Sequence, residues 1–433
     1  MQFSMKQLYL RLICNRKVLD AFTTNFTIKC NYARWAHRRP SAIVNEHELF
    51  KDVDENNIDT LEVEKERHDG RARKIKSQKK FSPNENNLSN TIANKEIKAS
   101  NKTNVNRLSN RVINLKENDH IITSLMMNVK SRKMREKNNQ ICMEGYRLIK
   151  DGIEAGVKPE IIFFSRLSDI EDLPLHEEVK LYKIPYRTIQ LWSNLTTSPG
   201  IIGIFQIPNV ESTEPSPNAL PLTIICDNIR DPGNLGSVLR VAAGVGCEKI
   251  VLLKGCVDLW DTKVLRSAAG AHFRLPIHAS VTNELSSFIY DGMNVFVTDN
   301  NAANNELVFD NFNLETKYSI SKIYENSNFK NIELPESDEN LQNSKLKKLI
   351  RRSQSQLPII PYYAVDYCTS ETAIIVSGET EGLSLETVKL LWEKRAVRLN
   401  VPLLNNVESL NISTALGIIA FEFQRQIVFK QKE

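Results

Sequence analysis

The sequence predicts an α/β protein whose main domain has a mostly parallel sheet covered by helices. In the C-terminal half, apolar runs typical of fully buried strands alternate with helical patterns, beginning with a strand at residues 222–226 and a helix at 235–245. Because helical segments connect the strands, neighbouring strands are expected to run parallel. Further strands are expected at 249–253, 295–298, 361–365 and 373–376, and further helices at 264–270 and 413–429.

The composition excludes several classes of protein. The chain has 433 residues, of which 41% are hydrophobic and 25% charged, and its mean hydropathy is −0.34. No stretch approaches the roughly 18 consecutive apolar residues of a membrane-spanning helix. The seven cysteines are scattered, so neither a disulfide framework nor a metal site is expected. The net charge of +5 permits a nucleic-acid partner without arguing for one.

The first segment, residues 1–45, is strongly basic. Its single acidic residue is Asp20, and apolar and aromatic residues lie between the bases. This pattern is typical of a mitochondrial transit peptide, with a basic RNA-binding arm as the alternative. Residues 46–120 are rich in Asn, Lys, Glu and Ser without a sustained apolar period, which predicts a disordered linker.

Two domains are expected after this linker. Residues 121–210 contain a basic run at 130–137 and then strand, helix and strand patterns, which predict a small α/β domain. The proline-rich segment 211–221 is predicted to be an interdomain linker. The second domain is expected at 222–430, interrupted by a polar surface insertion at about 301–356.

Three strand ends of the second domain carry polar residues that a core does not need. The first is residues 227–240, with the sequence DNIRDPGNLGSVLR, which contains Asn234 and Arg240. In an open parallel sheet, loops at the carboxyl ends of strands bind ligands. Arg240 lies in an otherwise apolar helix, and the alternative to a functional role is a surface arginine whose stem covers apolar neighbours.

The second motif, residues 374–384, has the sequence IIVSGETEGLS, and the third, residues 401–415, has the sequence VPLLNNVESLNISTA. In the second, Gly378 and Gly382 allow close approach of the backbone to a ligand, although a plain tight turn is an alternative. In the third, Ser409 and Asn411 begin the last helix, where helix capping is the alternative explanation. The motif carries more polar residues than one cap requires, which indicates a polar ligand.

Together these motifs, in this order, resemble the SpoU (TrmH-like) family of RNA ribose 2′-O-methyltransferases of the SPOUT superfamily. The resemblance covers about residues 222–429, and the preceding unit looks like the family's small RNA-binding domain. With the transit-like leader and the insertion, the chain looks most similar to the mitochondrial large-subunit rRNA guanosine methyltransferase branch. The family usually has glycine where Ser377 stands.

The resemblance implies a trefoil-knotted C-terminal domain that binds S-adenosylmethionine and forms a homodimer. By the same resemblance the catalytic residues would be Arg240, Asn234, Glu379, Ser409 and Asn411, with Arg240 acting either as a base or by stabilising charge. The residues that would bind the cofactor are Ser377, Gly378, Gly382, Val401, Leu403 and Leu410.

The expected function is methylation of a ribose 2′-oxygen, that of a guanosine, in mitochondrial large-subunit rRNA in the matrix, which supports ribosome assembly. The alternatives are a mitochondrial tRNA ribose methyltransferase and a non-catalytic RNA-binding assembly factor.

Overall fold

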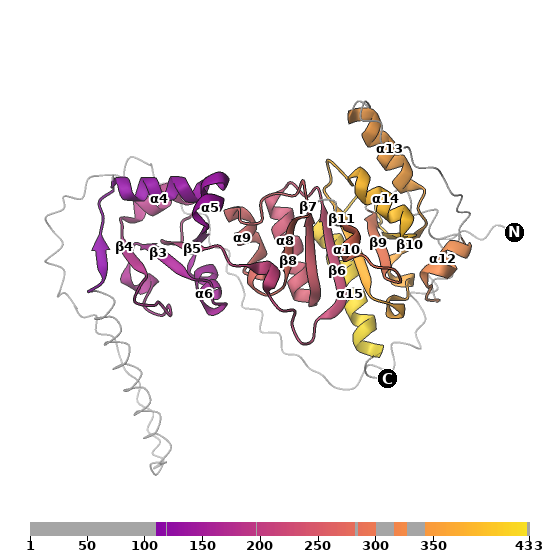
Figure 1. Ribbon diagram of the computed structural model, residues 1–433, viewed down its shortest axis with the longest axis horizontal. Helices are drawn as coiled ribbons and strands as arrows, with labels where there is room; N and C mark the ends of the chain where they lie inside the picture. Colours follow the sequence, from indigo (N-terminus) through magenta and orange to yellow (C-terminus); the bar gives the residue numbers. More distant parts are fainter. Residues whose placement is uncertain are drawn as a thin grey trace, which may run out of the picture. The chain divides into compact units, whose positions relative to one another are not determined.

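A computed structural model of the protein describes residues 110–117, 119–195, 197–281, 285–299, 316–326 and 343–430. Two β-sheets are found in these residues, one on each side of residues 211–219 in the sequence (Figure 1). Both sheets combine with helices, so the predicted α/β class is confirmed. The predicted transit peptide and the linker up to residue 109 lie outside the described residues.

The first sheet has five strands in the order β1-β4-β3-β5-β2. Its pairings are mixed: β1 with β4 and β4 with β3 are parallel, whereas β5 runs antiparallel to both β3 and β2. The strands are β1 (Val112–Asn114), β2 (Gln140–Glu144), β3 (Pro159–Phe164), β4 (Lys180–Lys183) and β5 (Ile201–Gln206). The helices are α4 (His120–Lys130), α5 (Arg132–Asn138), α6 (Tyr146–Glu154) and α7 (Tyr186–Trp192).

The second sheet has seven strands in the order β10-β12-β9-β11-β6-β7-β8, and every pairing is parallel. The strands are β6 (Leu220–Asp227), β7 (Cys247–Leu253), β8 (Ile277–Val281), β9 (Asn294–Asp299), β10 (Ile359–Pro361), β11 (Thr372–Ser377) and β12 (Val397–Asn400). The helices are α8 (Pro232–Val245), α9 (Thr262–Ala268), α10 (Leu285–Phe288), α12 (Ile320–Asn326), α13 (Asn343–Ser355), α14 (Leu385–Glu393) and α15 (Ile412–Lys430).

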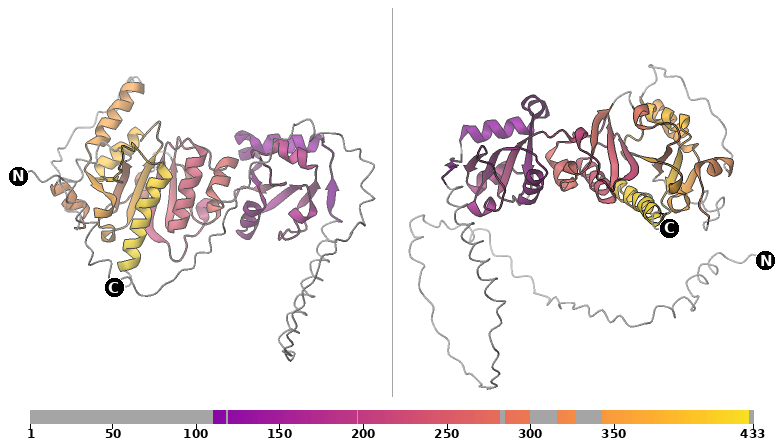
Figure 2. Two further views of the ribbon diagram at one scale, coloured as in Figure 1. Left: turned by 180° about the vertical axis from the view of Figure 1, so that it is seen from behind. Right: turned by 60° about the horizontal axis from the view of Figure 1, so that its bottom comes forward.

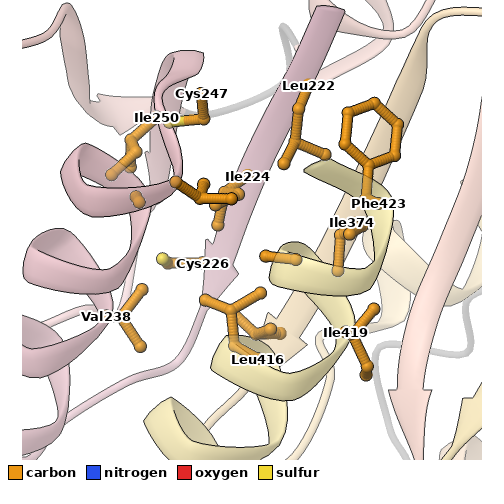
Figure 3. Close-up of a cluster of buried hydrophobic side chains, with 14 of the residues drawn as sticks. Leu222, Ile224, Cys226, Val238, Cys247, Ile250, Ile374, Leu416, Ile419 and Phe423 are labelled. Carbon is orange, nitrogen blue, oxygen red and sulfur yellow. The ribbon is translucent and has the colours of Figure 1, made fainter. Parts of the chain in front are cut away.

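The two faces of this sheet form two separate cores because successive side chains of a strand point to opposite faces. Ile224 of β6 belongs to the cluster shared with α8 and α15, whereas the next residue, Ile225, belongs to the cluster shared with α14. Figure 3 shows side chains of β6, α8 and α15 meeting in the first cluster, among them Val238 and Leu416. Helices α8 and α15 lie side by side on that face (Figures 1 and 2).

The observed elements differ from the predicted ones at several places. The strand expected at 361–365 ends at Pro361, and a 3₁₀ turn, Tyr362–Ala364, follows it. The strand β1 lies within the segment that was predicted to be disordered, and three residues are too few to show a period. The expected insertion contains α12 and α13, and Ile350 of α13 is buried in the core beside α14.

Among the described residues, no helix combines the length and the apolar character required to cross a lipid bilayer.

Candidate active site

A cavity of about 620 Å³ lies at the carboxyl ends of β9 and β11 in the seven-stranded sheet. Its lining comes from those strand ends, the loop that follows β11, the helix α13 and the segment before α15. The lining residues are Thr298, Asp299, Lys347, Ile350, Arg351, Gln354, Ser377, Gly378, Glu379, Glu381, Gly382, Leu383, Glu408 and Ser409. The second and third sequence motifs therefore meet in one cavity at the edge of the sheet where parallel α/β proteins bind ligands.

The structure brings five of the predicted site residues together in this cavity. They are Ser377, Gly378, Glu379, Gly382 and Ser409. The other six are not among the described residues that line it: Arg240, Asn234, Asn411, Val401, Leu403 and Leu410.

Gly378 lies directly against the loop that follows β6. Its N–H donates to the carbonyl of Asp227 at 3.0 Å, and a Cβ atom placed on Gly378 would lie 2.2 Å from the carbonyl oxygen of Asn228. The amide of Asn228 also donates to the carbonyl of Gly382 at 3.2 Å. Because β6 and β11 are paired neighbours, these contacts fix the first motif against the second. At this position the glycine is required for packing rather than for a special backbone angle.

Asp227 ends β6 as a fully buried carboxylate. One of its oxygens accepts from the N–H of Ser384 at 2.7 Å, while Oδ1 has no hydrogen-bond partner among the described residues. Burial raises the pKa of Asp227, and the hydrogen bonds from Ser384 and Thr387 oppose that shift. Asp227 was not among the predicted site residues, although a carboxylate that ends an apolar strand is a signal of a polar site.

Glu381 lies between two cations from different parts of the chain. Its carboxylate is 3.1 Å from Arg230 of the first motif and 2.5 Å from Lys347 of α13. The two ion pairs and the hydrogen bond from Lys347 lower the pKa of Glu381, with the hydrogen bond as the largest cause. The cavity wall formed by α13 is thereby tied to the second motif.

Asn234 and Asn411 connect the first motif to the third. The amide of Asn411 donates to Oδ1 of Asn234 at 2.8 Å. Each residue also belongs to a helix start: the N–H of Asn234 donates to the capping carboxylate of Asp231 at 2.7 Å, and Oδ1 of Asn411 accepts from the N–H of Ser413 at 3.0 Å. Helix capping therefore accounts for part of the role of Asn411, but its contact with Asn234 goes beyond a cap.

Arg240 is exposed on α8, outside the cavity. The described part of the chain offers its guanidinium no hydrogen bond or ion pair. A single chain therefore does not bring Arg240 to the five cavity residues, and its catalytic role stays a prediction.

The helix α13, which lines the cavity, and the arginine that holds its end were not predicted from the sequence. Arg398 of β12 is buried and pairs with Asp299 at 2.7 Å. It also donates to the carbonyls of Ser355 and Leu357, at 2.7 and 2.9 Å, where α13 ends. An arginine between the apolar residues Val397 and Leu399 was the available signal, because such a charge is buried only with a partner.

Comparison with known proteins identifies the family. Residues 221–421 match the model of the SpoU rRNA methylase family, and residues 125–203 match the model of an MRM3-like substrate binding domain. The mitochondrial rRNA methyltransferase 3 of Mus musculus is 37% identical over 73% of this chain and 74% of its own length. The chain belongs to the SpoU rRNA methylase family.

This SpoU methylase is also similar to more distant proteins. The 23S rRNA (guanosine(2553)-2′-O)-methyltransferase of Bacillus subtilis is 25% identical over 68% of this chain and 92% of its own length. The solved structure of an AdoMet-bound rRNA methyltransferase from Sinorhizobium meliloti has a TM-score of 0.51 and 18% identity, and covers 73% of this chain and 99% of that one. The latter likeness supports the fold. The protein is an S-adenosylmethionine-dependent rRNA methyltransferase.

The cavity fits this cofactor. Its volume is in the range of small-molecule sites, about 300–1,000 Å³. The lining holds four carboxylates, those of Asp299, Glu379, Glu381 and Glu408, against the cations of Lys347 and Arg351. Asp299 and Glu381 are paired with Arg398, Arg230 and Lys347, whereas Glu379 and Glu408 have no ion-pair partner among the described residues. These two carboxylates suit a cofactor that carries a sulfonium and an ammonium group. When bound, S-adenosylmethionine supplies an electrophilic methyl group, and the residues that line the cavity would hold it.

Proposed function

We propose that the protein methylates the 2′-oxygen of a guanosine ribose in mitochondrial large-subunit rRNA and so supports ribosome assembly in the matrix. The observation that carries this proposal is the cavity that joins the second and third motifs in a chain 37% identical to a mitochondrial rRNA methyltransferase. The Bacillus subtilis relative is named for guanosine 2′-O-methylation of 23S rRNA. Its name supports the 2′-oxygen as the methylated atom and guanosine as the nucleoside.

The proposed cofactor site is the loop that follows β11. Ser377, Gly378 and Gly382 line the cavity through a segment fixed against β6, so they would hold the cofactor largely by backbone contacts. Val401, Leu403 and Leu410 belong to the loop between β12 and α15, which we propose to form the other side of a trefoil knot with the β11 loop.

The proposed catalytic residues act on the ribose rather than on the cofactor. Glu379 and Ser409 line the cavity and would orient the 2′-hydroxyl, while the Asn234–Asn411 contact holds the first motif next to the third. Arginine stays protonated in proteins. Arg240 would therefore stabilise the negative charge that develops on the attacking oxygen or bind the adjacent phosphate.

A homodimer would complete this site. Three large apolar side chains on α15 are exposed, namely Phe421, Val428 and Phe429, with 47%, 38% and 59% of their surface accessible. Such a patch on the last helix favours contact with a second copy. In the proposed dimer, Arg240 of one protomer lies at the cavity of the other, which explains why one chain leaves it outside. Sedimentation of the parent and of a Phe421→Ser/Phe429→Ser variant tests the interface.

The function is tested by mapping 2′-O-methylated riboses in mitochondrial rRNA and tRNA after depletion of the protein. The proposal expects one guanosine in large-subunit rRNA to lose its methyl group, and to regain it with the parental protein but not with Arg240→Ala. Loss of a tRNA methyl group instead would establish the tRNA alternative. Unchanged methylation together with defective ribosome assembly would establish the non-catalytic assembly factor.

The location in the matrix has a separate test. Residues 1–45 fused to a fluorescent reporter should be imported into mitochondria, because their basic charge and apolar residues match a transit peptide. A diffuse cytosolic signal would contradict this part of the proposal.

A further inference from the structure

The domain with the five-stranded sheet contains a cavity larger than the one at the methyltransferase motifs. Its volume is about 800 Å³. It lies where β1, β3 and β4 end, since Asn114, Ser165 and Lys183 are among its lining residues. These three strands run parallel to one another, so their carboxyl ends meet at one edge of the sheet. None of the motif residues contributes to this cavity.

An exposed aromatic ring lies at this cavity. Tyr186, the first residue of α7, is 41% exposed and lines the cavity together with Pro185. Its hydroxyl donates to the carbonyl of Ser198 at 2.9 Å. The backbone oxygen that accepts this bond belongs to another wall of the same cavity. The tyrosine is therefore held in place while a large part of its surface stays accessible, which is the property of a stacking platform.

The charged side chains at the cavity are cations only. Lys183 and Arg166 are exposed lining residues, and no carboxylate is among the described residues that line it. Asp169 contacts two of the lining residues: it accepts from Ser165 and from the N–H of Arg166, and lies 3.8 Å from the Arg166 guanidinium. With 73% of its side chain exposed, Arg166 can still bind an anion. Lys183 has no acidic partner among the described residues.

We propose that this cavity binds one unpaired nucleotide of the RNA substrate, with its base on Tyr186 and its phosphates at Lys183 and Arg166. The combination of an accessible ring with two cations matches a nucleotide, which has an apolar face and an anionic backbone. The proposal rests on the proposed function as an RNA methyltransferase. It adds a second contact site for the RNA, separate from the site where the ribose reacts. It requires the bound nucleotide to be unpaired, because both faces of a base inside a duplex are already covered by the neighbouring base pairs.

The test compares variants of the full-length protein for binding of a fluorescent single-stranded oligoribonucleotide and of the same sequence as a duplex. Tyr186→Ala should weaken single-strand binding by about 5- to 100-fold, the effect of losing one stacked base. Tyr186→Phe should stay within about 3-fold of the parent because it keeps the ring. Leu191→Ala removes a side chain from the same helix that is 76% exposed and outside this cavity, and should have no effect.

The cations have their own readout. The Arg166→Ala/Lys183→Ala variant should reduce the slope of log affinity against log salt by about 1 to 2, whereas Arg187→Ala, which lines a different cavity, provides the matched control. S-adenosylmethionine affinity, measured by calorimetry, should be parental in every variant. Parental single-strand affinity in Tyr186→Ala would overturn the nucleotide site and leave the methyltransferase function intact. Failure of the parent itself to methylate rRNA would instead refute the proposed function.

Discussion

Replacing Gly378 by alanine tests whether close packing of the first two motifs builds the cofactor site. The added Cβ would lie 2.2 Å from the carbonyl oxygen of Asn228, 3.1 Å from its carbonyl carbon and 3.5 Å from Cα of Ile229. An ordinary contact begins at 3.4 Å, so the two backbones must separate by about 1.2 Å (3.4 − 2.2). All three neighbours are backbone atoms, which no rotamer change can move away.

The loss of stability in Gly378→Ala can be estimated from the contacts that the added methyl group disturbs. Overpacking of a close-packed region typically costs about 1–3 kcal/mol in the free energy of unfolding. Separation also lengthens the bonds from Gly378 N–H to Asp227 and from Asn228 to Gly382, each worth about 1 kcal/mol. We expect Gly378→Ala to lose about 2–4 kcal/mol of stability. Its cofactor affinity should fall at least 10-fold, because the displaced backbone lines the cavity.

Urea unfolding and calorimetry with S-adenosylmethionine measure the two effects. The control is Gly244→Ala, since a Cβ there meets nothing within 4 Å and the residue lies in α8. Alanine in a helix is favoured over glycine, so this variant should gain about 0.5–1 kcal/mol and keep its affinity. A Gly378→Ala protein with parental stability and parental cofactor affinity would show that the loops move apart freely, and the packing argument would be wrong.

Three further predictions concern single side chains. Arg240→Ala should lower methyl transfer by about two to three orders of magnitude with little change in cofactor affinity, and Arg240→Lys should not restore it; a parental rate in either variant refutes a catalytic role. Burial lowers the pKa of His272 to about 4, so its neutral form stabilises the fold fully above the unfolded-state pKa and progressively less as pH falls. Between pH 7.5 and 4.5 the free energy of unfolding of the parent should fall by about 2–3 kcal/mol more than that of His272→Gln. Glutamine can keep the hydrogen bond to Leu259 but does not titrate. Equal pH profiles of the two proteins in urea unfolding would contradict this. Arg398→Met should cost about 3–5 kcal/mol of stability by removing the buried partner of Asp299, and a change below 1 kcal/mol would show that the pair is dispensable.

The sequence patterns predicted the fold where local signals were strong. The strand at 222–226 and the helix at 413–429 were found because each has an uninterrupted apolar period, and the structure extends both by only a few residues. The short strands β8 and β12 were missed. In β12 the buried Arg398 interrupts the apolar run, and its partner Asp299 is 99 positions away in the sequence. No local pattern can show that such a charge is paired.

The candidate site was also predicted only where the local sequence pattern was strong. Ser377, Gly378 and Glu379 come at the end of a clear strand, and the structure brings these three predicted site residues together in one cavity. The helix α13 was not predicted to line it, because a basic helix in a polar segment gives no sign of what it packs against. The position of Arg240 outside the cavity depends on which way a helix faces, and the spacing of residues within one motif does not determine that.

Because α13 forms one wall of the cavity, binding of the cofactor and transfer of its methyl group would depend on different parts of the chain. The residues proposed to act on the ribose lie in the three sequence motifs, whereas the lining residues Lys347, Ile350, Arg351 and Gln354 come from α13, outside every motif. In the proposed cofactor site, substitutions in α13 should therefore change the dissociation rate of the cofactor without altering the motif residues. Arg398 donates to the carbonyl of Ser355, the last residue of α13, and to that of Leu357 just beyond it, so one buried side chain holds the end of this helix.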